Sequence, residues 1–123
     1  MFWSYLCIML PDNELQQHWF QLEYALTERL GKKLTLEDIL LFIGVREAGI
    51  PPKEFTEREK IELMQVAIST ILVPAKYYEL LWVEDTGWPH FKQLQPIKEM
   101  NAKDKEFFYK KYILLYAEKN KVI

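Results

Sequence analysis

Apolar residues recur at helical spacing in four segments of this chain. Over residues 13–30, five apolar side chains return every three or four positions: Leu15, Trp19, Leu22, Leu26 and Leu30. At about 100° per residue they form one stripe, which is typical of a helix that packs against a core. Asp12 before this segment and Gly31 after it suit the two caps of a helix. The pattern predicts a helix with one buried face.

Residues 36–48 are apolar on almost every side. Thr35 is a candidate N-cap with Asp38 three positions on, and Gly49 ends the segment. The apolar positions are Leu36, Ile39, Leu40, Leu41, Phe42, Ile43 and Val45. A helix that is apolar nearly all round belongs in the interior of a domain. We therefore expect residues 36–48 to form the most buried helix.

A third helix is predicted by the pair Thr56 and Glu59, which matches a capping box. It should run to about Val73, because Pro74 cannot continue a helix. The residues expected to face inward are Ile61, Met64, Ala67, Ile68, Ile71 and Leu72.

The last helix should begin after Asn101, with Asp104 three positions on, and run to about Lys119. Its expected inward stripe is Phe108, Tyr112, Leu115 and Tyr116. Phe107 and Leu114 lie on a different side of this helix. That second patch is either covered by another element or a candidate interface for a partner.

Between Pro74 and Asn101 the apolar residues no longer recur at helical spacing. Residues 77–84 and 88–92 are rich in aromatic and branched side chains, and the turn signal Asp85-Thr86-Gly87 separates them. We interpret this region as an antiparallel hairpin. The alternative continues a helix from Ala75 to about Trp82 and leaves the rest as a loop.

These elements predict a mainly α fold, a small single-domain bundle of about four helices with a short aromatic β-hairpin or loop between the third and last helix. The domain should span residues 12–123, preceded by an apolar extension over residues 1–11. Three interpretations of that extension stay open: a buried strand or turn, a flap that binds a partner, or an overcalled start before Met9.

Several short sequences together resemble a family of small, uncharacterised bacterial proteins. They are His18-Trp19, Gly31-Lys32-Lys33, the run 39–45, Tyr77-Tyr78-Glu79 and Asp85-x-Gly87-Trp88-Pro89-His90. The resemblance implies a bacterial cytoplasmic protein and implies no activity, cofactor or site residue.

Composition and charge narrow the function classes. The 123 residues contain one cysteine, Cys7, so an internal disulfide or a cysteine-rich zinc site is excluded. The net charge of the chain is −2, and although residues 98–123 carry seven lysines against four acids, the chain as a whole is acidic. We therefore expect no binding to nucleic acid. The apolar run 1–10 is shorter than the roughly 20 residues that cross a bilayer, so we expect no membrane insertion. The run is a poor signal peptide and the chain has no disulfides, so we expect a cytoplasmic location.

Few residues suggest catalysis. The chain has no phosphate-binding glycine loop and no metalloprotease motif, and its two histidines, His18 and His90, lie on separate elements. We expect no metal and no cofactor, and we expect His18 to be a partly buried structural residue. Glu47 is a candidate buried carboxylate, because a continued helix would point it at apolar surroundings, which could make it a general acid or base. The alternative is that Glu47 reaches water or pairs with a lysine or arginine.

The densest group of polar and aromatic side chains is Tyr77, Tyr78, Glu79, Trp82, Asp85, Trp88 and His90. Such groups line small-ligand pockets, but they also hold short hairpins together. Our leading hypothesis is a non-catalytic binding or assembly module that presents Phe107, Leu114 and the hairpin aromatics to another protein or to its own copy. The alternative is a small-molecule-binding protein or small enzyme that uses the Tyr78, Trp88 and His90 cluster, with Glu47, Glu79 and Asp85 as further candidates.

Overall fold

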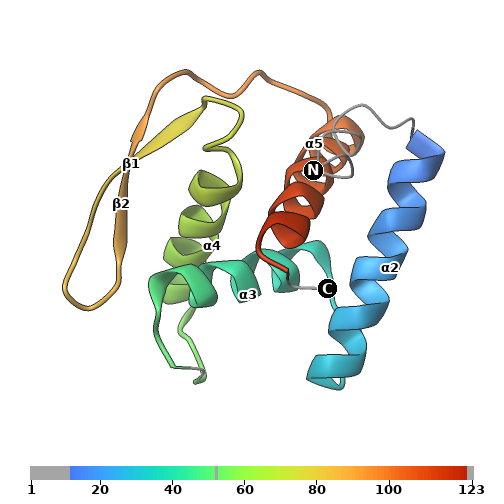
Figure 1. Cartoon of the computed structure of the whole chain (residues 1–123), viewed down its shortest axis with the longest axis horizontal. Coiled ribbons are helices and arrows are strands. Elements are labelled where there is room, and N and C mark those ends of the chain that lie inside the picture. The colour runs from blue at the N-terminus through green and yellow to red at the C-terminus, as the bar shows by residue number, and fades with distance from the viewer. Residues whose placement is uncertain (1–11, 52, 122–123) are drawn as a thin grey trace. The chain divides into compact units, whose positions relative to one another are not determined.

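The structure is a computed structural model that describes residues 12–51 and 53–121, so the apolar extension over residues 1–11 lies outside the described residues. Its elements, in chain order, are α2 (Asp12–Leu30), α3 (Leu36–Ala48), α4 (Glu57–Ile71), β1 (Tyr78–Val83), β2 (Pro89–Gln93) and α5 (Ala102–Lys119) (Figure 1). Four helices and a hairpin between the third and last helix confirm the predicted fold class. The alternative of a helix from Ala75 to Trp82 is wrong.

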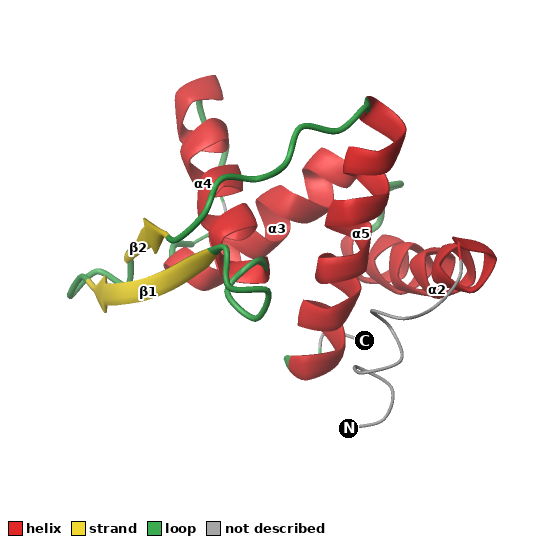
Figure 2. Cartoon of the chain, turned by 90° about the horizontal axis from the view of Figure 1, so that it is seen from above, coloured by secondary structure: helices red, strands yellow, loops and turns green. Residues whose placement is uncertain are grey.

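The chain divides into two compact units. One contains α2 and α5, at the two ends of the chain, and the other, residues 37–99, contains α3, α4 and the hairpin. Both views show α2 beside α5 within the first unit, and the hairpin beside α4 within the second (Figures 1 and 2). That residues 12–123 form one domain stays a prediction.

In the first unit, four of the five residues of the predicted α2 stripe are buried, and the prediction is wrong at Leu30. Leu15, Trp19, Leu22 and Leu26 are at most 3% exposed, whereas Leu30 is 46% exposed. Gly31 ends the helix at φ 76°, and its amide donates to the Thr27 carbonyl. The Lys110 ammonium of α5 lies 5.1 Å from the centre of the Trp19 ring.

The predicted inward stripe of α5 is only partly right. Tyr116 is buried, but Phe108, Tyr112 and Leu115 are half-buried. The most buried positions of this helix are Tyr109, Ile113, Leu114, Tyr116 and Ala117. Because α5 is apolar on several sides, its spacing alone did not identify the face with the closest packing. The Asn101 cap is confirmed, since its side chain accepts a hydrogen bond from the Asp104 amide at 2.8 Å.

In the second unit, α3 and α4 approach most closely at Gly44. A Cβ atom at this position would lie 2.0 Å from the Leu63 carbonyl oxygen, so only glycine allows this contact. Helix α3 spans the predicted residues, and Gly49 ends it at φ 68°. Only Glu37 and Arg46 of this helix are exposed, fewer than in any other described helix, in agreement with the prediction.

The predicted capping box of α4 is present. The Glu59 amide donates to Thr56 Oγ1 at 3.1 Å, and the Thr56 amide donates to Glu59 Oε1 at 2.9 Å. The predicted inward face is wrong at Ile61, which is 67% exposed. The buried positions are Leu63, Val66, Ala67, Ser69 and Ile71. Leu63 on this face is the residue that contacts Gly44 of α3.

The hairpin pairs β1 and β2 antiparallel, with Leu80 opposite Phe91 and Trp82 opposite His90. Leu81 therefore has no partner and forms a bulge in β1. Gly87, at φ 103° in the turn, is close to the end of α3, since a Cβ atom there would lie 2.9 Å from the Ala48 carbonyl oxygen. Glycine at this position lets the turn lie against α3.

Candidate functional site

The hairpin residues singled out from the sequence do not gather at one place. Trp82 and His90 stack on each other across the two strands, with ring centres 4.3 Å apart and planes 12° from parallel. His90 Nε2 also contacts Glu84 Oε2 at 2.5 Å. Trp88 belongs instead to the wall of a pocket described below. Trp82 stacks on His90, which contacts Glu84, and of these three residues only Glu84 lines the same pocket as Trp88.

The remaining members of this group are spread over the hairpin. The Tyr78 hydroxyl lies 3.5 Å from Gln65 Nε2 of α4, and Tyr77 is half-buried. Glu79 is exposed opposite Lys92, and Asp85 is exposed in the turn. Successive strand residues point to opposite faces, so neighbours in the sequence do not share a cavity.

An open pocket of about 410 Å³ lies within the second unit, where three segments of the chain meet. The segments are the loop after α3, the first two turns of α4 and the turn of the hairpin. The lining residues are Ile50, Phe55, Glu59, Glu62, Leu63, Glu84, Thr86 and Trp88. Trp88 is the only one of the candidate site residues named from the sequence that lines it.

Three carboxylates and two aromatic rings dominate the lining of this pocket, and none of the lining residues is basic. The Thr56 amide and the Lys53 ammonium, 3.2 Å from Glu59 Oε2, lower the pKa of the Glu59 carboxyl below its ordinary value of 4.5. The Glu84 carboxylate is held by His90. Glu62 is exposed and has no hydrogen-bond or ion-pair partner among the described residues.

Sequence reasoning missed Phe55, Glu59, Glu62 and Glu84 as site residues. Glu59 was assigned to the cap of α4, a role that it also has. The available signal was the spacing of Glu59 and Glu62, three positions apart on one helix and hence on one face. The approach of the hairpin turn to that face has no comparable signal in the sequence.

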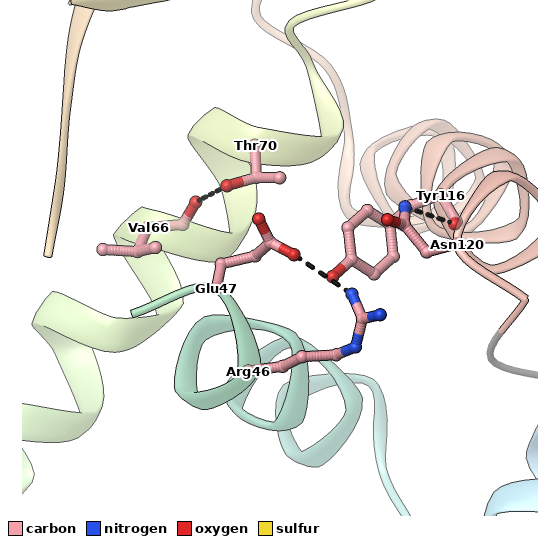
Figure 3. A network of polar contacts seen from close by, with 6 residues as sticks. All are labelled: Arg46, Glu47, Val66, Thr70, Tyr116 and Asn120. Carbon is pink, nitrogen blue, oxygen red and sulfur yellow. Dashed lines mark hydrogen bonds and ion pairs between the residues drawn. The ribbon is translucent and has the colours of Figure 1, made fainter. Parts of the chain in front are cut away.

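Glu47 pairs with its neighbour Arg46. Figure 3 shows the two side chains together, with Arg46 Nη1 at 3.2 Å from Glu47 Oε2. The Glu47 side chain is 29% exposed. Glu47 therefore fits the alternative in which it pairs with an arginine, rather than the candidate buried carboxylate. In the same view the Thr70 hydroxyl donates to the Val66 carbonyl at 2.8 Å, a bond internal to α4.

The candidate interface of Phe107 and Leu114 is largely covered. Leu114 is fully buried, and the Lys111 ammonium lies 5.3 Å from the centre of the half-buried Phe107 ring. Of the two alternatives for this patch, Leu114 therefore fits the covered one. His18 is half-buried on α2, and His90 lies on β2.

In the described part of the second unit, the longest run of exposed large apolar residues lies on β1, while Ile61 and Leu94 are exposed singly. Four consecutive residues, Leu80, Leu81, Trp82 and Val83, are 50–55% exposed. In the first unit, Phe20 and Tyr24 of α2 are 61% and 69% exposed. Continuous apolar exposure along a strand is unusual and marks a candidate contact surface.

Within residues 12–51 and 53–121, no group of three histidine, cysteine, aspartate or glutamate side chains could hold a metal ion. Over the same residues, every helix is too short or too polar to cross a membrane.

Comparison with protein-family models, with curated proteins and with solved structures finds no match for this chain. The resemblance to small bacterial proteins therefore stays a prediction.

Proposed function

We propose that this chain is a non-catalytic assembly module that pairs with a second copy of itself along β1. The observation that carries the proposal is the run of four apolar side chains on β1, each at least half exposed. Complete burial of such a side chain contributes about 1.5–3 kcal/mol, and roughly half of that remains available at each position.

The two strands of the hairpin differ in how they suit pairing with another strand. Among the described residues the sheet has two strands, so each strand has one edge without a partner. Strand β2 carries Pro89, which lacks an amide donor, and Lys92, two residue types that protect strand edges. Strand β1 has neither, its one charged residue is Glu79, and its one irregularity is the bulge at Leu81. Strand addition at β1 is therefore favoured over addition at β2.

A second copy fits β1 without a clash of charges. If two β1 strands pair antiparallel with Leu80 opposite Leu81 of the other copy, Glu79 lies opposite Trp82 and Tyr78 lies opposite Val83. No two carboxylates then face each other, and apolar pairs occupy the centre. A two-fold pairing of this kind is the commonest symmetry of protein dimers.

The test is the mass of the protein in solution as a function of concentration. The wild type should approach twice the mass of the chain, and Leu81→Glu should remain a monomer because it places two carboxylates at the centre of the pairing. Ile61→Glu is the matched control, since it puts the same charge on an exposed apolar position of α4 and should associate as the wild type does. A wild type that is monomeric at every concentration contradicts the proposal, and so does equal loss of association in both variants.

The proposed partner is protein rather than nucleic acid, because the net charge of −2 gives no attraction to phosphate. The resemblance to bacterial proteins supports the cytoplasm as the proposed compartment. The second candidate function, binding of a small molecule, is favoured by one observation, the pocket beside Trp88.

A further inference from the structure

We propose that the pocket formed by Phe55, α4 and the hairpin turn binds an organic cation that carries an ammonium or guanidinium group. This inference does not rest on pairing through β1. It rests on the lining of the pocket, on the position of Lys53 and on the size of the space.

The pocket offers both interactions that hold organic cations in proteins. Phe55 and Trp88 supply aromatic rings, whose faces attract a positive charge. Glu59, Glu62 and Glu84 supply carboxylates, and no lysine or arginine is among the lining residues. The carboxylates would repel an anion, and a neutral ligand would leave Glu62 without a counter-charge.

The chain itself shows how a cation is held beside this pocket. The Lys53 ammonium lies 3.2 Å from Glu59 Oε2 and 5.7 Å from the centre of the Phe55 ring. One aromatic ring and one carboxylate of the lining therefore already hold an ammonium group. Lys53 is exposed and is not itself part of the lining, so the space beside Trp88 and Glu62 is left open.

The carboxylates that remain are unequal. Glu84 is fixed by His90, which in turn stacks on Trp82. Glu62 has no hydrogen-bond or ion-pair partner among the described residues, and we therefore infer that its carboxylate pairs with the positive charge of the ligand. Glu84 lines the same pocket, but its carboxylate is already in contact with His90.

The size of the pocket favours an organic ligand over a bare ion. Its volume of about 410 Å³ lies toward the small end of the range for small-molecule sites, roughly 300–1,000 Å³. No three acidic, histidine or cysteine side chains among the described residues come together around one point, as a metal ion would require. A compact cation such as a trimethylammonium or guanidinium compound matches both facts.

The experiment titrates the protein with choline and follows the backbone amide signals of Thr86 and Gly87 by NMR at constant ionic strength. The control ligand is the uncharged analogue of choline in which a tert-butyl group replaces trimethylammonium. We expect choline to give saturable shifts with a dissociation constant of about 1 mM or tighter. The uncharged analogue should bind at least about fivefold more weakly, since it lacks the attraction to the rings and carboxylates.

Three variants locate the site. Glu62→Gln should weaken choline binding about fivefold or more, whereas Glu79→Gln, which removes the same charge from an exposed position outside the pocket, should leave it unchanged. Trp88→Leu should abolish saturation. Lys53→Gln should tighten choline binding, because Glu59 then becomes available to the ligand, and a merely structural role of these residues would not produce a gain.

Each contrary result overturns the proposal. Absence of saturable shifts with choline excludes the site. Equal binding of choline and its uncharged analogue shows an apolar pocket rather than a cation site. Equal effects of Glu62→Gln and Glu79→Gln show attraction to the overall charge of the chain. Because Leu81→Glu leaves every lining residue unchanged, choline binding by that variant separates this proposal from pairing through β1.

Discussion

Helix α2 and strand β1 place their apolar residues in opposite ways. In α2 the four residues of the core stripe are at most 3% exposed, and the exposed pair Phe20 and Tyr24 lies roughly 150° away on the other side of the helix. In β1 four apolar residues follow one another, and all are at least half exposed. In a helix, the spacing of the residues places buried and exposed apolar side chains on different faces. A strand of a two-stranded hairpin has no further strand and few neighbouring elements to cover its side chains on either face.

This difference separates apolar residues that fold the chain from apolar residues that do not. The stripe of α2 is already buried, so its contribution goes to stability. The run in β1 keeps half of its surface in water, so roughly half of its contribution becomes available only when something covers it. The following predictions test that separation, beginning with the largest effect.

The close contact of α3 and α4 should be the least tolerant position of the second unit. Gly44→Val places side-chain atoms where the Leu63 carbonyl lies, and we expect it to destabilise the protein by about 4 kcal/mol or more. Chemical denaturation measures this loss. Tolerance of valine at this position would mean that the second unit is loosely packed throughout, and the exposure of β1 would then not be special.

Matched leucine truncations compare the two regions directly. Leu22→Ala in α2 should cost about 3 kcal/mol, because it leaves a cavity in a fully buried stripe. Leu81→Ala in β1 should change the stability by less than about 0.5 kcal/mol when measured at a concentration where the protein is monomeric. Similar losses in the two variants would remove the distinction between the regions.

The cap of α4 should have a smaller effect. Thr56→Ala removes the acceptor for the Glu59 amide and should cost about 1 kcal/mol. Thr56→Ser keeps the hydroxyl and should stay close to the wild type. A loss from Thr56→Ala as large as that from Leu22→Ala would mean that the cap supports tertiary packing as well as the first turn of the helix.

The smallest effect depends on pH. The hydrogen bond from the Thr56 amide and the Lys53 ammonium lower the pKa of the Glu59 carboxyl in the folded protein. A lowered folded pKa stabilises the folded state above the ordinary value of 4.5, and this stabilisation is lost as the pH falls through the lower, folded value. Glu59→Gln should therefore be less stable than the wild type at neutral pH, and the two should converge in acid. Glu62→Gln serves as the control, and a difference between wild type and Glu59→Gln that persists in strong acid would contradict this account.

The sequence predicted where the helices begin and end better than it predicted which of their faces are buried. The Thr56 and Asn101 caps, and the glycines at 31 and 49, are local signals, since each acts within a few residues of the chain. The inward face of α4 was wrong at Ile61, because the burial of this helix is set by the approach of α3 at Gly44, far away in the sequence.

The candidate site could be predicted only in part. Trp88 was identified because aromatic residues gather in the hairpin, and it does line the pocket. The carboxylates around it come from α4 and from the end of β1, so no single stretch of sequence contains the pattern. Tyr78 lies opposite Gln93 at the open end of the hairpin, whereas Trp88 follows the turn, so the two side chains are at opposite ends of the hairpin.

The most direct test of the central claim is amide hydrogen exchange at low and high protein concentration. The account predicts that exchange in residues 78–83 slows as the concentration rises, because the free edge of β1 becomes paired, while exchange around Phe20 and Tyr24 stays the same. Unchanged exchange in β1, or slowing around Phe20 and Tyr24 instead, would contradict the claim that β1 is the surface through which two copies of this chain associate.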